Sequence, residues 1–355
     1  MADAVVITGV GVLTGLGQTA QSHAAMRAGF ARITEWEDLL LMGPDEEWDP
    51  PTPMRASAAA IAWAGVPPRE RLVTVALPAL DEALASAQLT AKDWKDVSLH
   101  LALRAPVAPA TIESFGAGVV EDLHVRGGLA KAAATRVVAR GHASGALAIQ
   151  RAAAEVASGE RKFAVVGAVD GFSDMADLER LDKTFRLRSE RAADGYMPGE
   201  AAVFLVLEEA GAAKMRGATA LARIGAIGLA EEPHPLGDTT PTKAEGLCEA
   251  IRAALGTKRP AAKPWLLSDQ NGERHRAKEW ALALVRLDAL VGGEHELWFP
   301  AQSFGDAGVA SVPLAAAMAC EAFARELAPA PAALLLSSSD GPERAAMLLH
   351  AVKGA

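Results

Sequence analysis

Two hydrophobic patterns alternate along the chain and predict strands and helices in turn. Short runs rich in Val, Ile and Leu are typical of buried strands, whereas Ala-rich stretches with apolar positions every three or four residues are typical of helices. The strand-like runs lie at residues 4–11, 96–106, 136–139, 162–171, 201–209, 264–273, 296–308 and 332–341. The helix-like stretches lie at residues 22–30, 71–87, 111–123, 146–157, 244–256, 276–290 and 310–326. This alternation predicts an α/β fold in which helices cover parallel or mixed sheets.

One segment, EEPHPLGDTTPT at residues 231–242, interrupts this rhythm because it is dense in Pro and Thr and has no periodicity. It predicts a boundary between an N-terminal half, residues 1–235, and a shorter C-terminal half, residues 240–355. Both halves show a similar order of strand, loop and helix. We therefore expect two related α/β halves that form one body.

Four polar or glycine-containing loops follow predicted strands, and they are the candidates for a functional site. In open α/β sheets, ligands bind beyond the carboxyl ends of the strands. The loops are RGHASG (140–145), SDQNGE (268–273), QSFGDAG (302–308) and SSSDGPE (337–343). A rigid scaffold that positions such loops commonly uses them for chemistry.

The first of these loops has the pattern of a strand–turn–helix elbow. The run RVVA precedes it and the amphipathic stretch ALAIQRAAAEVA follows it. Gly141 and Gly145 relieve the crowding of the turn, and His142 stands at its apex, at a helix N-terminus where enzymes commonly place a nucleophile. Ser144 is expected to cap the helix, with a reserve nucleophile as the alternative.

Composition and charge exclude several classes of function. The net charge is −9 and the basic residues are dispersed, so nucleic acid and anionic membranes are poor partners. Two cysteines, Cys248 and Cys320, cannot build a disulfide framework or a four-cysteine zinc site, and the histidines show no ligand spacing, so we expect no metal and no cofactor. No basic residue precedes Arg27, and no stretch approaches the roughly 20 apolar residues of a membrane span. These features predict a cytoplasmic protein.

The glycine-rich start, VVITGVGVLTGLG, is a partial match to a dinucleotide-binding motif. Gly9 and Gly11 fill the first two glycine positions, but the third falls on Thr14. The acidic strand end expected about 20 residues later is absent, because Glu35 and Glu37 lie in a segment with little strand character. We expect these glycines to allow close backbone packing at a turn instead.

Taken together, several segments resemble the β-ketoacyl synthases of the thiolase-like superfamily. The resemblance begins at VVITGVGVLTGLGQT (5–19) and continues through GHASGALAIQRAAAEVASGERKFAVVGAVDG (141–171). It is strongest in DGYMPGEAAVFLVLEEAGAAKMRGA (194–218) and looser in the second half. The resemblance implies two pseudo-equivalent halves in a five-layered αβαβα arrangement, usually a homodimer that acts on acyl carrier protein or coenzyme A thioesters. The family's chemistry is acyl transfer to an elbow cysteine, followed by a decarboxylative condensation that two histidines assist.

The chain departs from this pattern at all three catalytic positions. By the resemblance, the family's cysteine falls on His142, its first histidine on Asn271 and its second on Asp306. The usual lysine before the second histidine is absent, SSSDGPER replaces the glycine-rich C-terminal loop, and the segments that shape the acyl tunnel are shortened. Covalent loading through an elbow thiol is therefore excluded. The remaining candidate substrate-binding residues are Ser144, Gly305, Ser338 and Ser339.

Two hypotheses from different classes follow from these departures, beside functions outside acyl metabolism. In the first, the protein is a non-condensing partner or acyl-binding subunit, like the polyketide chain-length factors, in a homodimer or in a heterodimer with an active ketosynthase. In the second, it is an acyltransferase, hydrolase or malonyl decarboxylase. Asp306 would then orient His142 as a general base, and Asn271 would donate a hydrogen bond to an oxyanion.

Two further polar segments receive less specific interpretations. Residues 273–276, Glu-Arg-His-Arg, stand at the start of a predicted helix and are expected to be a solvated terminus. By the resemblance, RSERAADGY (188–196) lies near the pocket mouth or the dimer edge. Its arginines are candidates for docking an acidic carrier protein, with plain surface solvation as the alternative.

Overall fold

The computed structural model describes residues 4–42, 51–59, 66–90, 92–106, 111–172, 174–256, 263–291 and 296–352. The strands are β1 (Val5–Thr14), β2 (Gly17–Gln18), β3 (Thr34–Leu41), β4 (Thr52–Ala56), β5 (Val97–Leu103), β6 (Ala134–Val138), β7 (Phe163–Asp170), β8 (Ala201–Glu209), β9 (Ala222–Glu231), β10 (Trp265–Ser268), β11 (Leu297–Trp298), β12 (Ala332–Ser338) and β13 (Glu343–His350). The α-helices are α1 (Thr19–Arg27), α2 (Pro68–Ser86), α3 (Ile112–Arg126), α4 (Ser144–Ala157), α5 (Met175–Lys183), α6 (Ala210–Met215), α7 (Glu245–Leu255), α8 (Arg274–Arg286), α9 (Asp288–Val291), α10 (Ala301–Phe304) and α11 (Ser311–Ala324). Two short 3₁₀ helices are η1 (Trp94–Asp96) and η2 (Gly308–Ala310).

The strand order repeats itself in the two parts of the chain. The main sheet runs β11-β10-β12-β13-β9-β1-β8-β7-β5-β6. In the first part, β6, β5 and β7 are parallel neighbours, and β8 and β1 follow in antiparallel pairing. In the second part, β11, β10 and β12 are parallel, and β13 and β9 follow in antiparallel pairing. The first part contributes β1, β5, β6, β7 and β8 to this path, and the second contributes β9 to β13. When the five strands of each part are numbered in chain order, both parts have the spatial order 3-2-4-5-1.

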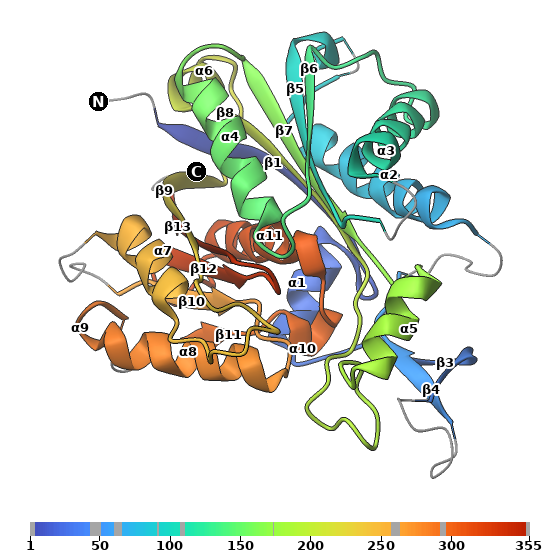
Figure 1. Cartoon of the computed structure of the whole chain (residues 1–355). Coiled ribbons are helices and arrows are strands. Elements are labelled where there is room, and N and C mark those ends of the chain that lie inside the picture. The colour runs from blue at the N-terminus through green and yellow to red at the C-terminus, as the bar shows by residue number, and fades with distance from the viewer. Residues whose placement is uncertain are drawn as a thin grey trace.

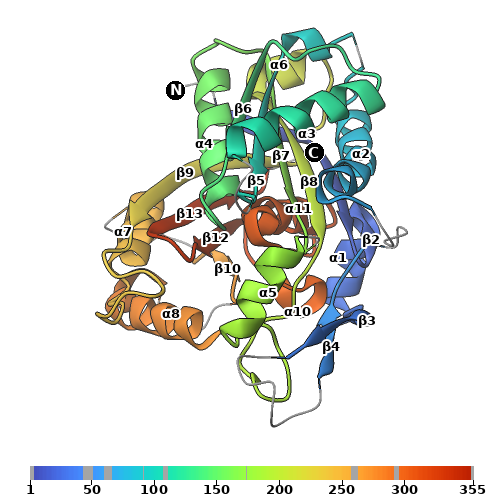
Figure 2. The same ribbon diagram turned by 45° about the vertical axis from the view of Figure 1, so that its right-hand side comes forward.

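Helices cover both parts in equivalent positions and produce five layers. Helices α2 and α3 pack together on the outer side of the first part, and α7 packs on β9 and β13 with α8 beside it on the outer side of the second. Between the two parts lie α4, which contacts β5, β7 and β8 as well as β9 and β13, and α11, which contacts β1, β8 and β12. Figures 1 and 2 show α4 and α11 enclosed between the two sets of strands. This is the α/β, αβαβα arrangement that the family resemblance implies.

The largest hydrophobic cluster lies in this middle layer and contains buried residues of α4, α11 and the strands on both sides. Almost every position of α11 is buried, as expected for a helix surrounded by protein on all sides. Among the described residues, no helix combines the length and the apolar character needed to cross a membrane.

Most of the predicted elements are confirmed, and several predictions are wrong. Glu35 and Glu37 do not lie in a strand-poor segment: they belong to β3, which pairs with β4 in a separate two-stranded ribbon at the lower right of Figure 1. Strand β9 and helix α5 were not expected. The predicted strand at 296–308 is a two-residue strand, β11, followed by the short helix α10.

Gly9 and Gly11 serve packing, as expected, but within a strand and not at a turn. Both lie inside β1, which crosses α2. A Cβ atom on Gly9 would lie 2.3 Å from the backbone oxygen of Ala83, and one on Gly11 would lie 1.9 Å from that of Ala79. Only glycine allows β1 and α2 to approach this closely.

Candidate functional site

The elbow forms as the sequence predicts. Strand β6 ends at Val138, the chain turns through residues 139–143, and α4 begins at Ser144. Gly141 has a φ of +61°, and a Cβ atom there would lie 2.8 Å from the side chain of Ser339. A Cβ atom on Gly145 would lie 2.3 Å from Cδ of Pro313, near the start of α11. Both glycines are therefore required by space, and the elbow is fitted tightly against α11.

Two predicted substrate-binding serines instead hold the elbow in shape. The hydroxyl of Ser144 accepts a hydrogen bond from the backbone N–H of Arg140 at 2.6 Å, so it closes the turn before the helix and does not cap the helix itself. The hydroxyl of Ser339 donates to the carbonyl oxygen of Arg140 at 2.6 Å and accepts from the N–H of Ala143 at 3.0 Å. Because both hydroxyls are buried and used within the elbow, neither is placed to contact a substrate.

The three residues that the resemblance assigns to catalytic positions, His142, Asn271 and Asp306, come together in one cluster. Nε2 of His142 lies 2.8 Å from Oδ1 of Asp306, and the backbone N–H of Gly308 donates to the same oxygen at 2.8 Å. Nδ2 of Asn271 donates to Oδ2 of Asp306 at 2.6 Å and to Oε2 of Glu273 at 2.9 Å. The loops after β6, β10 and β11 thus meet at one point.

Arg276 is a fourth member that was not predicted. The expectation that residues 273–276 form a solvated helix end is wrong for Arg276 and Glu273, whose side chains are 1% and 6% exposed, but it is confirmed for Arg274, which is 86% exposed. Its Nη2 lies 3.2 Å from Nδ1 of His142, 3.3 Å from Nε2 of His142 and 3.2 Å from Oδ1 of Asp340. Its Nη1 donates to Oδ2 of Asp269 at 3.0 Å and to the carbonyl oxygen of Ser338.

These contacts fix the role of the imidazole of His142. A guanidinium only donates hydrogen bonds, and a carboxylate only accepts them. Nε2–H of His142 therefore donates to Asp306, and Nη2 of Arg276 lies within hydrogen-bond distance of both ring nitrogens, so that both nitrogens are engaged.

Electrostatics keep the carboxylates of the cluster ionised. Burial alone would raise the pKa of Asp306, but His142, Arg276 and the hydrogen bond from Asn271 outweigh it and hold that pKa well below its usual range. Asp340 behaves in the same way: burial acts to raise its pKa, but hydrogen bonds from Arg186 and the charge of Arg276 lower it.

Arg186 completes the outer side of the cluster. It donates to Glu273 at 2.7 and 2.9 Å and to Asp340 at 2.6 and 3.1 Å. The ligand atoms of Glu273, His275 and Asp340 lie within 4.8 Å of one another, close enough in principle for a metal ion. Both carboxylates already hold the Arg186 guanidinium, whose positive charge opposes a cation there. Burial lowers the pKa of His275 to about 4.

In the part of the chain that the structure describes, the cavity at Asp306 is small. The cavity that reaches Asp306, lined also by Arg104, Phe172 and Tyr196, has a volume of about 20 Å³. A site of this size accommodates about one water molecule and no acyl group.

The remaining predicted positions also serve the structure. Gly305 has a φ of +70°, and a Cβ atom there would lie 2.7 Å from the backbone oxygen of Pro198. The backbone N–H of Ser338 donates to Asp269 at 2.8 Å. Cys248 and Cys320 are both buried, and burial raises the pKa of each thiol, so they are inert core residues as expected.

Comparison with known proteins gives matches for one segment of the sequence and for the fold. Residues 130–213, which span the elbow, α4, β7 and β8, match the sequence model of the β-ketoacyl synthase N-terminal domain. A search of curated proteins finds no significant match. Many solved structures share the fold at low sequence identity.

Three of these structures illustrate the likeness. The oxazolomycin ketosynthase domain OzmH KS7 of Streptomyces albus JA3453 superposes with a TM-score of 0.77 at 16% identity, covering 99% of this chain and 74% of its own. A type II polyketide synthase acyl-carrier protein in complex with its ketosynthase bound to the hexaketide gives 0.79 at 15% identity, covering 99% and 100%. The ishigamide ketosynthase/chain length factor gives 0.78 at 18% identity, covering 99% and 100%. The sequence match therefore covers one segment of the chain, residues 130–213, and the solved structures show that the chain has the thiolase-like fold of ketosynthases.

Proposed function

We propose that the protein is a non-condensing β-ketoacyl-synthase-like subunit of fatty acid or polyketide-type acyl metabolism. In this role it acts as a partner of an active ketosynthase, in the manner of a chain-length factor. The observation that carries the proposal is that the side chains of the central cluster use their hydrogen-bonding groups on one another. At the positions where the family resemblance expects a nucleophile and two histidines, side chains bind one another.

The hydrogen-bonding capacity of the cluster supports this proposal. Both ring nitrogens of His142 are engaged, by Asp306 and Arg276. Both N–H groups of the Asn271 amide are directed at carboxylates, of Asp306 and Glu273. A general base needs a free lone pair and an oxyanion donor needs a free N–H. Neither is left in this arrangement, and the adjoining cavity is too small for a thioester.

The second hypothesis, an active acyl-thioester enzyme that uses His142, is supported by one contact. Asp306 lies within hydrogen-bond distance of His142, as that mechanism requires. It also needs an open site, and Arg276 would have to move away from Nδ1. If this enzyme existed, His142→Ala would lower kcat by about 100-fold or more, and Asp306→Asn would do likewise.

The partner is proposed to be an active ketosynthase, or a second copy of this chain, with an acyl carrier protein or coenzyme A thioester as the substrate of the assembly. Structures of the same fold include a ketosynthase/chain length factor and a ketosynthase with its carrier protein. Arg188 and Arg191, in the loop 188–196, remain the candidate residues for docking an acidic carrier. A cytoplasmic location belongs to the same proposal.

We also propose that the chain consists of two equivalent halves. The sequence boundary at 231–242 assigns β9 to the first half, 1–235. The repeated strand order supports a division between α6 and β9 instead, because β9 holds the same position beside β13 that β1 holds beside β8.

Co-expression tests the proposed role. The protein is expressed alone and together with an active ketosynthase encoded beside it, and release of free thiol from acetyl- and malonyl-coenzyme A is measured. We expect no turnover by the chain alone and a stable complex on co-expression. A self-sufficient homodimer that hydrolyses thioesters, and loses this activity in His142→Ala, would contradict the proposal.

A further inference from the structure

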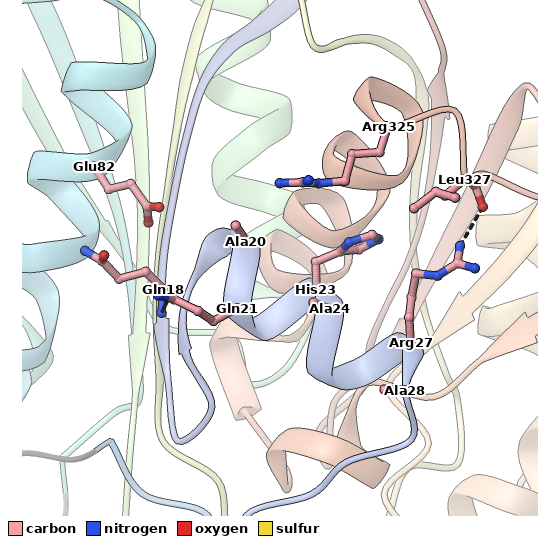
Figure 3. A pocket seen from close by; sticks show the side chains of 10 residues that line it. All are labelled: Gln18, Ala20, Gln21, His23, Ala24, Arg27, Ala28, Glu82, Arg325 and Leu327. Atoms are coloured by element: carbon pink, nitrogen blue, oxygen red, sulfur yellow. Dashed lines mark hydrogen bonds between the residues drawn. The ribbon is translucent and has the colours of Figure 1, made fainter.

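A second site lies between α1, α2 and α11, at the far end of α11 from the elbow. The elbow packs against Pro313 in the first turn of α11, whereas Arg325 follows its last residue. At 1.5 Å per residue, these two positions are about 18 Å apart along the helix. The pocket has a volume of about 760 Å³. Its lining residues are Gln18, Ala20, Gln21, His23, Ala24, Arg27, Ala28, Glu82, Arg325 and Leu327, all shown in Figure 3.

One buried side chain in this pocket lacks a hydrogen-bond partner. His23 is 2% exposed, and its Nε2 makes no hydrogen bond to any described residue. Buried polar atoms are almost always paired, and this unpaired atom belongs to a side chain that lines the pocket. Burial, together with the charges of Arg27 and Arg325, lowers the pKa of His23, although Glu321 acts in the opposite direction.

Two guanidinium groups flank this imidazole, as Figure 3 shows. Arg27 donates through Nη1 to the carbonyl oxygen of Leu327 at 2.9 Å, and Arg325 donates through Nε to Glu321 at 2.8 Å. Each of these bonds uses one nitrogen of a planar group with five N–H donors. The unused donors suit a carboxylate, which guanidinium groups bind in a bidentate manner.

The rest of the pocket limits which chemical groups can be attached to a bound carboxylate. Ala20 and Ala24 lie one turn apart on α1, Ala28 follows its last residue, and together they supply an apolar wall, with Leu327 near the arginines. On the other side, Oε2 of Glu82 accepts from the N–H of Val12 at 2.9 Å and from the hydroxyl of Thr19 at 2.7 Å. The negative charge of Glu82 disfavours a second anionic group at that end.

We propose that this pocket binds a small monocarboxylate with a short apolar chain, its carboxylate held by Arg27, Arg325 and His23. The site is independent of the role proposed for the central cluster, because it lies at the opposite end of α11. No residue of the cluster lines it.

Binding of sodium butyrate to the full-length protein, measured by calorimetry, tests this proposal. We expect butyrate to bind more tightly than 1-butanol, which lacks the charge. It should also bind more tightly than succinate, which has the same chain length but places a second carboxylate near Glu82. In protein labelled with ¹⁵N-histidine, the Nε2 resonance of His23 should shift on saturation. Equal affinity for butanol, tighter binding of succinate, or an unchanged His23 resonance would each overturn the proposal.

Matched variants separate the site from general effects on the fold. Arg325→Gln is expected to weaken butyrate binding about tenfold or more, because a charged hydrogen bond is lost. Arg180→Gln removes a comparable exposed ion pair, with Asp177 on α5, and should leave binding unchanged. His23→Gln is expected to weaken binding. His124→Gln, which replaces another buried histidine with an unpaired Nε2, should not. Wild-type affinity in Arg325→Gln, or equal losses in both members of a pair, would refute the assignment.

Discussion

Replacement of Arg276 by methionine tests the central cluster most sharply, because it removes the charge and keeps an apolar side chain of similar length. Arg276 is 1% exposed and bridges Asp269, Asp340 and His142. Its loss leaves the buried carboxylate of Asp269 without its counter-charge. Removing one partner of a buried ion pair typically costs about 3–5 kcal/mol.

The expected size of the effect on thermal unfolding follows from the chain length. An unfolding entropy of about 2.1 cal/mol/K per residue gives about 0.7 kcal/mol/K for 355 residues. A loss of about 3–5 kcal/mol then lowers Tm by about 4–7 °C. Arg274→Met is the matched control, two residues earlier on α8, because the Arg274 side chain is 86% exposed and pairs with Asp194 on the surface. Such a pair contributes about 0–1 kcal/mol, so the control should shift Tm by less than about 1.5 °C.

Calorimetry of both variants and the wild type at neutral pH gives the comparison directly, with circular dichroism to verify that each variant is folded. If Arg276→Met melts within about 1.5 °C of Arg274→Met, the charges around His142 do not stabilise one another as described, and the cluster is not the closed unit proposed here.

Two further perturbations test the elbow and the pH response. Gly145→Ala should destabilise the protein by about 1–3 kcal/mol, because the new methyl group meets the ring of Pro313. Gly118→Ala, a helical glycine whose nearest neighbour is the flexible side chain of Arg69, should be neutral or slightly stabilising in the same denaturation assay, and equal losses in both variants would contradict the packing argument. Stability should fall as pH drops from about 6.5 to about 4, because unfolded His275 binds a proton that the folded state excludes. His275→Gln should flatten this decline in Tm, and an unchanged slope would refute the assignment. Below about pH 4, the decline should continue in both proteins as carboxylates with lowered pKa values, such as Asp306, are protonated.

Local pattern was sufficient to predict most of the fold and the elbow. The period of hydrophobic residues found the central strands and helices, and Gly141 and Gly145 marked a turn that the structure fills tightly. Strand β9 was missed because glycines interrupt its apolar run, although its burial shows partial alternation. Helix α5 is mostly polar, and its buried face consists of Leu178 and Leu181, three residues apart. This spacing is a helical signal that the sequence already contained.

The sequence predicted only part of the site, because some of its contacts join residues that are far apart in the chain. The rule that loops meet at the carboxyl ends of strands selected four loops, and the family resemblance selected His142, Asn271 and Asp306 within three of them, which the structure brings together. Arg276 was missed because an arginine at a helix start is usually solvated, whereas this one contacts His142 and Asp340 on two other loops. Partners so distant in sequence leave no local pattern. Whether the cavity was open also depended on side chains from several elements, which spacing alone does not reveal.

The most direct measurement of the central claim is the state of the His142 ring during exposure to substrate. In ¹⁵N-histidine-labelled protein, with His142→Gln to assign the signal, the account predicts that both ring nitrogens are engaged, with the Nε2 proton hydrogen-bonded to Asp306. Both resonances should stay unchanged when acetyl- or malonyl-coenzyme A is added. A ring with a free nitrogen, or resonances that move as thioester is added and consumed, would contradict the claim that this site is closed.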